Sequence, residues 1–203
     1  MYFINIILAI WGPHLGVSLA AALRKRKMSK ELKKIPLSDR SEMAVQVAAL
    51  LKTPKQDERI IGWSMIAIFF IVQFLLPAHL WGKVIGMLIT LGVGFYRMRT
   101  ELPDLLTRGD AKALREEVKQ ASKYGEKIRA EALVAGAMEV QDPNLFLFSI
   151  DWLVKWRSVW ATKFLKEIDP ETLNYKVRSL CEQGIREGME LIKHPEPTQI
   201  QTL

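Results

Sequence analysis

The side chains that most often carry catalysis are few and scattered in this sequence. The 203 residues contain three histidines, His14, His79 and His194, and one cysteine, Cys181. There is no glycine-rich phosphate loop, and no His-x-x-x-His or paired-cysteine spacing of the kind that binds a metal ion. We therefore expect a protein that is not an enzyme and that carries no cofactor or metal.

One of the histidines occupies an unusual place. His14 lies in the middle of a long apolar segment, directly after Pro13. An ionisable group at such a depth in a membrane segment is a candidate for function, because burying it without a partner is costly. The alternative is that neutral His14 hydrogen-bonds a backbone carbonyl freed by Pro13, or a neighbouring helix. The sequence leaves both interpretations open.

Three tryptophans recur at helical spacing in the C-terminal half. Trp152, Trp156 and Trp160 lie four residues apart, with lysine and arginine among them. Such a stripe fits the core of a helical bundle, because other apolar residues extend the same face. It also fits a contact with the membrane interface, where tryptophan and lysine occur together, or a groove for a partner protein. We treat the three tryptophans as candidate contacts with a membrane or partner.

A second pattern predicts helix pairing. Small and apolar residues follow steps of three and four over three heptads, as in a coiled-coil seam. This seam would pair with another helix of the chain or with a second copy of the protein, which makes a homo-oligomer one alternative. Its residues are Leu114, Val118, Ala121, Gly125, Ile128, Ala132 and Ala135.

The composition of the N-terminal segment predicts a membrane helix. Residues Tyr2 to Leu23 contain no charged side chain, and this length at a rise of about 1.5 Å per residue reaches roughly 33 Å. A signal peptide would carry positive charge before its apolar part, whereas here the basic residues follow it. We expect these basic residues to hold the N-terminus outside and to contact anionic lipid. They are Arg24, Lys25, Arg26 and Lys27.

A second apolar block predicts a helical hairpin. Residues Ile60 to Tyr96 contain one charged side chain, Lys83, and Pro77 lies near the centre. Proline in a helix interior costs about 3 kcal/mol, so we expect two segments, Ile60 to Leu76 and Leu80 to Tyr96. Each is short for a membrane span, which leaves a re-entrant hairpin as an alternative.

Small residues spaced by four predict where these segments touch. Gly82 and Gly86 form one such pair in the hairpin, and Gly16 and Ala20 form another in the first segment. Small side chains let helix backbones approach closely in a membrane.

The net charge of +7 is unevenly distributed. Residues 24–59 hold eleven Lys or Arg and five acids, whereas residues 97–203 hold equal numbers of each. The surplus therefore lies beside the apolar segments, where it orients them in the membrane. Binding to nucleic acid is not expected, because no nucleic-acid motif accompanies the charge.

The remaining segments are predicted to be helices, and capping residues and prolines indicate where these helices begin and end. Ser38 or Asp39 would cap a helix that ends near Lys52, and the pairs Asp142-Pro143 and Asp169-Pro170 each combine an N-cap with proline in the first turn. Helices are therefore expected at 110–140, 143–168 and 170–193, and no segment shows the alternation of a strand.

Together these patterns predict an all-α integral membrane protein with three transmembrane segments and a cytosolic C-terminal helical domain. The expected parts are a transmembrane helix (1–23), a basic cytosolic loop with an amphipathic helix (24–59), a transmembrane hairpin (60–96), a three-helix domain (97–193) and a disordered tail (194–203). The expected location is a bacterial inner membrane.

Size and topology favour an interaction protein as the function. We expect helices presented at the cytosolic face to a membrane or cytosolic partner, in an accessory subunit of an envelope secretion or conjugation machine or in an exclusion or immunity factor acting on one. A membrane-shaping hairpin protein and a small channel or transporter subunit are the alternatives. The hairpin motivates the first of these and His14 the second.

Overall fold

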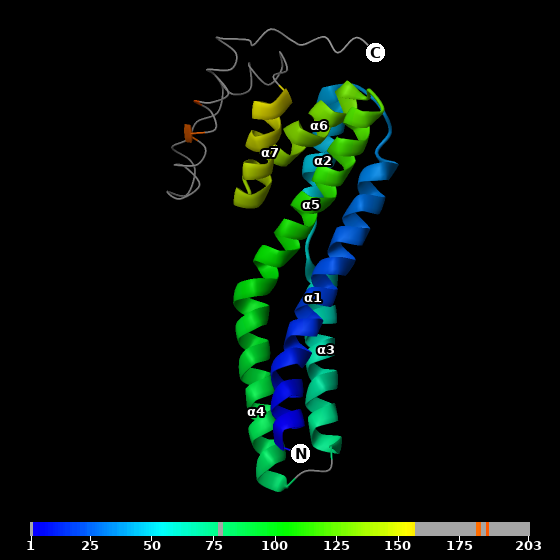
Figure 1. Cartoon of the computed structure of the whole chain (residues 1–203). Helices are drawn as coiled ribbons and strands as arrows, with labels where there is room; N and C mark the ends of the chain where they lie inside the picture. The colour runs from blue at the N-terminus through cyan, green and yellow to red at the C-terminus, as the bar shows by residue number, and fades with distance from the viewer. Residues whose placement is uncertain (1, 77–78, 157–181, 184–185, 187–203) are drawn as a thin grey trace. The chain divides into compact units, whose positions relative to one another are not determined.

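A computed structural model describes residues 2–76, 79–156, 182–183 and 186, and every regular element in these ranges is a helix (Figure 1). The predicted all-α class is confirmed for this part of the chain. The chain divides into two compact units, which are described separately. Unit 1 comprises Met1–Lys34 and Lys52–Ala113, and unit 2 comprises Ile35–Leu51 and Leu114–Leu203.

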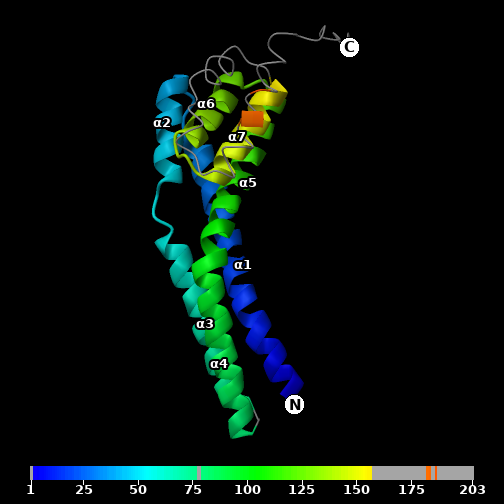
Figure 2. The ribbon, with the colours of Figure 1, turned by 90° about the vertical axis from the view of Figure 1, so that its left-hand side faces the viewer.

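Unit 1 is built on three helices that contact one another: α1 (Tyr2–Lys34), α3 (Gln56–Leu75) and α4 (Leu80–Tyr96). Figures 1 and 2 show them side by side, with the N-terminus at the same end as the α3–α4 turn. Leu76, at the end of α3, has an extended backbone with ψ of 140°. A residue before proline is forced out of the helical region, so Pro77 produces the predicted break.

The helix α1 is longer than the sequence predicted. It continues past Leu23 through the basic run and ends at Lys34. Lysine and arginine are good helix formers, and no glycine or proline interrupts residues 17–34. The expected boundary at Leu23 therefore marks a change of side-chain polarity within one helix, and residues 24–34 are not a loop.

The surface of unit 1 is strongly apolar along its three long helices. Within the described residues, all but four of the exposed large hydrophobic side chains belong to α1, α3 and α4. The segments Ile4–Lys34 and Arg40–Leu75, of which the second contains α3, are long and apolar enough to cross a membrane by length and composition. At 17 residues, α4 is shorter than α1 and α3.

Unit 2 has a conventional apolar core. Its helix α2 (Arg40–Leu51) packs on α6 (Lys127–Met138), and α6 also contacts α7 (Pro143–Trp156). The last nine residues of α6, Ala130 to Met138, are all buried. This C-terminal part of α6 is therefore surrounded on every side, as expected for the central helix of a small domain.

Two of the predicted helix caps are confirmed. The carboxylate of Asp39 accepts a hydrogen bond from the Ser41 amide at 3.2 Å, ahead of α2. The carboxylate of Asp142 accepts one from the Asn144 amide at 3.0 Å, ahead of α7. Asp169 and the predicted helix at 170–193 lie outside the described residues, apart from three positions near Cys181, and so does the tail at 194–203.

The predicted single helix at 110–140 is wrong in two places: where it begins and near its middle. Its beginning is continuous with α4, through a π-helical turn (Arg97–Glu101) that leads into α5 (Leu102–Lys123). Its middle is interrupted at Gly125, where φ is +74°. The amide of Glu126 bonds the Ala121 carbonyl at 2.8 Å and that of Gly125 bonds the Ser122 carbonyl at 3.2 Å, which is a Schellman cap.

Candidate functional site

Small residues line the face of α4 that points into the unit 1 bundle. Along α4 the buried positions are Gly82, Gly86, Thr90 and Gly94, which recur every four residues. A methyl group at Gly94 would lie 3.0 Å from an Ile66 side-chain carbon, so α3 passes close to the α4 backbone. The predicted Gly82 and Gly86 spacing therefore lies on the buried face of α4, where small residues permit close helix packing.

Two buried amides lie among these glycines, and sequence reasoning overlooked both. Gln73 on α3 is fully buried, and its Nε2 donates to the Asn5 carbonyl of α1 at 2.8 Å. The side chain of Asn5 is also buried. Within the described residues, Asn5 Nδ2 and Gln73 Oε1 have no hydrogen-bond partner. The sequence does contain a signal for Gln73, because it is the one asparagine or glutamine between Ile60 and Tyr96 and therefore a polar side chain in an apolar segment.

Replacing Gln73 by leucine is expected to reduce the free energy of unfolding by about 1 kcal/mol, since hydrogen bonds between membrane helices average only about 0.6 kcal/mol. Thr90→Val is the matched control. Thr90 is equally buried, but its hydroxyl donates to the Gly86 carbonyl of its own helix at 2.8 Å. Equilibrium unfolding in mixed micelles containing SDS measures both variants. A larger loss in Thr90→Val than in Gln73→Leu would contradict the interhelical role of Gln73.

The His14 side chain is exposed on the surface of unit 1 and is not buried inside the bundle of α1, α3 and α4. Its Nδ1 is 2.8 Å from a guanidinium nitrogen of Arg97, which also pairs with Glu101 at 2.7 Å. Arg97 thus supplies a hydrogen-bond partner for His14 from a neighbouring helix, which is one of the two arrangements that the alternative interpretation offered. The His14 ring also meets the Trp11 ring edge-on, with centroids 5.9 Å apart.

A buried charge cluster lies where α1, α3 and α5 meet within unit 1. The Arg24 guanidinium is 2% exposed and binds the Asp110 carboxylate at 2.8 Å, across 86 residues of sequence. Glu58, equally buried, lies 3.8 Å from Arg24, and Lys55 lies 3.4 Å from Asp110. Burial raises the pKa of Asp110, against the opposing influence of the two cations.

This cluster corrects one predicted lipid contact. Of the four basic residues that follow Leu23, Arg24 is buried and bound to acids, so it cannot reach a lipid headgroup. Lys25 is partly buried, whereas Arg26 and Lys27 are exposed. Lys27 pairs with Asp57 at 2.8 Å on the surface. The lipid contact of the three remaining residues stays a prediction.

The predicted coiled-coil seam does not run along one helix. Leu114, Val118 and Ala121 are buried on α5, and Ala132 and Ala135 are buried on α6. Between them Gly125 and Ile128 are exposed around the Schellman turn. The residues that follow Gly125 are thus part of a different helix, and the heptad register stops there. Self-association of the protein stays a prediction.

The predicted tryptophan stripe is described only at its start. Trp152 on α7 is buried, as expected for a core position. Trp156 is the last residue of α7, and Trp160 lies outside the described residues. Which of the three interpretations applies to the whole stripe stays open to experiment.

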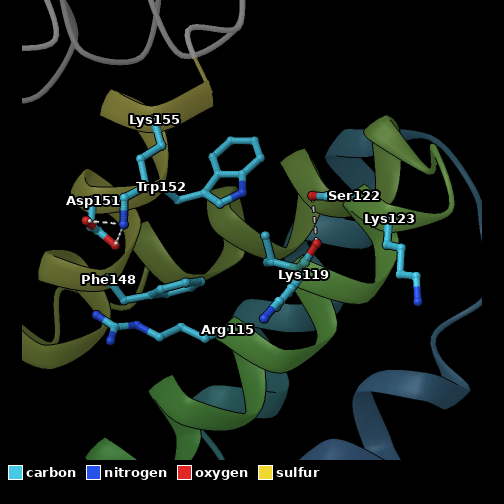
Figure 3. A pocket seen from close by; sticks show the side chains of 9 residues that line it. Arg115, Lys119, Ser122, Lys123, Phe148, Asp151, Trp152 and Lys155 are labelled. Atoms are coloured by element: carbon cyan, nitrogen blue, oxygen red, sulfur yellow. Dashed lines mark hydrogen bonds and ion pairs between the residues drawn. The ribbon is translucent and has the colours of Figure 1, made fainter. Parts of the chain in front are cut away.

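A pocket in unit 2 of about 520 Å³ lies between α5 and α7, and we call it the α5–α7 pocket. Figure 3 shows aromatic side chains of α7 on one side and basic side chains of α5 on the other. Its lining consists of Arg115, Val118, Lys119, Ser122, Lys123, Phe148, Asp151, Trp152 and Lys155. The volume is typical of a site for a small organic ligand.

Internal contacts already fix part of this lining. The Arg115 guanidinium lies over the Phe148 ring, 5.4 Å from its centroid, and Lys155 pairs with Asp151 at 3.0 Å. The Ser122 hydroxyl donates to the Val118 carbonyl at 2.7 Å, which leaves its oxygen able to accept a hydrogen bond. Sequence reasoning missed the pocket because the basic residues of α5 and the aromatic residues of α7 are separated by the whole of α6.

Comparison of the chain with protein families, with curated proteins and with solved structures finds no match. Within the described residues, no group of three or more histidine, cysteine, aspartate or glutamate side chains could hold a metal ion. The features that indicate a function are therefore the apolar surface of unit 1, its buried charge cluster and the α5–α7 pocket.

Proposed function

We propose that the protein is a membrane-anchored interaction protein, in which unit 1 is the anchor and unit 2 is a helical module in the cytosol. One observation carries the proposal. Most of the residues buried along α1, α3 and α4 are small or polar, although Val17 and Ile66 join a small apolar core, and large apolar side chains cover the outside of the bundle. Exposing such an apolar surface to water is unfavourable, whereas a lipid bilayer solvates it. Glycines inside the bundle let the helices pack closely, which stabilises their association in a bilayer.

The exposed residues follow this inside-out distribution closely. Leu75, Leu80 and Trp81, at the α3–α4 turn, are each more than 70% exposed. Lys83 lies in the same region and donates to the Phe74 carbonyl at 2.9 Å. A lysine that bonds a helix-end carbonyl beside exposed tryptophan is typical of a membrane interface.

The proposed topology has three spans, with the N-terminus and the α3–α4 turn outside. It rests on the basic residues that follow Leu23 and on the α3–α4 turn lying at the same end of unit 1 as the N-terminus (Figure 1). Unit 2 then lies in the cytosol, and a bacterial inner membrane is the proposed location.

The exposed apolar residues Tyr124 and Ile128 at the α5–α6 turn are candidates for contact with a partner in a larger membrane assembly.

Cysteine labelling in intact cells tests this topology. In a Cys181→Ser background, a maleimide that cannot cross membranes should label Lys83→Cys in intact cells. It should label Tyr124→Cys, whose native side chain is 73% exposed, only after the membrane is broken. Labelling of Tyr124→Cys in intact cells would contradict a cytosolic unit 2, and failure to label Lys83→Cys before lysis would favour a re-entrant hairpin.

Co-purification tests the interaction. Extraction in a mild detergent should recover a stoichiometric partner with the wild-type chain, and less of it with a Tyr124→Ser/Ile128→Ser variant. Gln120→Ala, at another exposed position of α5, is the matched control. Recovery of homo-oligomers alone would count against an interaction with a different protein.

A further inference from the structure

The basic side chains of the α5–α7 pocket carry more positive charge than their surroundings neutralise. Asp151 is the single acid in the described lining, and it already pairs with Lys155. Within the described part of the chain, no ion pair joins Lys119 or Lys123 to an acid. Arg115 is held over the Phe148 ring. Two lysines and an arginine therefore contribute charge that a ligand could neutralise.

Their spacing places these three cations on one face of one helix. Arg115, Lys119 and Lys123 follow one another at intervals of four residues on α5, and all three are exposed. Like charges at this spacing repel one another and destabilise a helix slightly. An anion bound between them would relieve that repulsion, and a phosphate group accepts hydrogen bonds from several lysine and arginine donors at once.

The opposite wall of the pocket is aromatic. Figure 3 shows Phe148 and Trp152 of α7 across the pocket from Arg115 and Lys119 of α5, with Lys123 further along the same helix and extended away from the rings. Trp152 is buried, so the edge of its ring is fixed by the surrounding core. Flat or apolar groups pack well against such rings, and fixed rings bind with little loss of conformational freedom.

We propose that the α5–α7 pocket binds a phosphate-bearing organic anion. Its phosphate contacts Lys119 and Lys123, and its flat or apolar part packs against Phe148 and Trp152. The pocket volume of about 520 Å³ suits a ligand of nucleotide size. The same chemistry occurs in a nucleoside phosphate, whose base is flat, and in a phospholipid, whose acyl chains are apolar. This inference goes beyond the proposed function, since it requires neither a protein partner nor the proposed topology.

Isothermal titration of the purified full-length chain in a neutral detergent tests the proposal. The probes are adenosine monophosphate, adenosine, inorganic phosphate and dihexanoylphosphatidylglycerol, which is a soluble phosphatidylglycerol with short acyl chains. At least one of the two phosphate esters should bind with a Kd about tenfold or more below that of inorganic phosphate and of adenosine. Tighter binding of adenosine monophosphate assigns the site to nucleotides, and tighter binding of dihexanoylphosphatidylglycerol assigns it to phospholipids.

Charge reversal supplies the matched comparison. Lys119→Glu and Lys123→Glu should each weaken the tighter ester by about tenfold or more, and higher salt should weaken it in the wild-type chain. Lys127→Glu makes the same change of charge at an exposed position of α6 outside the pocket, and it should leave the Kd unchanged. Circular dichroism verifies that each variant is folded.

Three results would overturn the proposal. The first is the absence of measurable binding by both esters to the folded chain. The second is equal weakening by Lys119→Glu and Lys127→Glu, because that result indicates attraction by net charge alone. The third is binding of adenosine as tight as that of the tighter ester, because the phosphate would then contribute nothing. None of these results bears on the labelling pattern expected for the membrane topology.

Discussion

Replacing Arg24 by methionine is expected to lower the free energy of unfolding by about 3–5 kcal/mol at neutral pH, the usual cost of removing one partner from a buried ion pair. Arg24 is 2% exposed and binds Asp110 at 2.8 Å. Without the guanidinium, the Asp110 carboxylate stays buried with Lys55 as its remaining cation. Equilibrium unfolding in mixed micelles containing SDS, followed by circular dichroism, measures the loss.

Lys27→Met is the matched control for Arg24→Met. Lys27 lies one turn further along the same helix and pairs with Asp57 near the start of α3 at 2.8 Å, where both partners are exposed. Its ammonium also lies 3.9 Å from the buried Glu58, which keeps Arg24 as a cation in this variant. Water solvates such a pair well in either state, so the control should unfold like the wild type. Equal losses in the two variants would show that burial does not set the cost.

The cost of Arg24→Met should depend on pH with a definite sign. Burial already raises the pKa of Asp110, and removal of the guanidinium raises the pKa further. When a carboxyl has a higher pKa in the folded state, the folded state binds more protons, and stability falls as pH rises through that pKa. The variant should therefore recover stability relative to wild type as pH is lowered from neutral. A penalty that is constant with pH would contradict this account.

The double variant Arg24→Met/Asp110→Leu separates the pair from its burial. Both charges of the pair leave together, so Asp110 is not left as a buried carboxylate without Arg24, and Glu58 and Lys55 are the acid and the cation that remain in the cluster. We expect the double variant to be more stable than Arg24→Met alone, and the two substitutions to be strongly non-additive. Simple addition of the two single losses would contradict a direct interaction between these side chains.

The parts of the fold that were predicted from the sequence depend on local chemistry. Pro77 ends α3 because it restricts the residue before it, and Asp142 starts α7 because its side chain accepts an amide hydrogen two residues later. Both signals act within a few residues, so they are visible in the chain itself. The break at Gly125 was also local, but the prediction counted this glycine as one of the seven small and apolar positions of the seam.

The parts that were missed depend on contacts between distant segments. The partner of Arg24 lies 86 positions away, so a basic run that reads as a solvated lipid contact contains one buried cation. The α5–α7 pocket likewise requires two helices that α6 separates in sequence. The pattern of charges in a chain indicates which residues need partners, and only the tertiary packing selects the partners.

A substitution at Gly136 tests the packing that holds the core of unit 2. A Cβ atom at this position would lie 2.6 Å from the Ala44 carbonyl oxygen and 2.6 Å from Val47 Cβ. Both atoms belong to α2, and neither is the end of a flexible side chain. The helices α2 and α6 must therefore move apart to admit a methyl group. We expect Gly136→Ala to lower the free energy of unfolding by about 1–3 kcal/mol.

The sign of this effect distinguishes packing from helix propensity. Alanine is the better helix former by about 1 kcal/mol, so Gly136→Ala would stabilise an isolated helix. Gly92→Ala is the control, because Gly92 is also helical and nothing lies within 4 Å of the point that its added methyl group would occupy. It should leave stability unchanged or raise it slightly. If Gly136→Ala did the same, α2 and α6 could not be in the close contact that builds this core, and Gly136→Leu, whose side chain is larger still, would be tolerated as well.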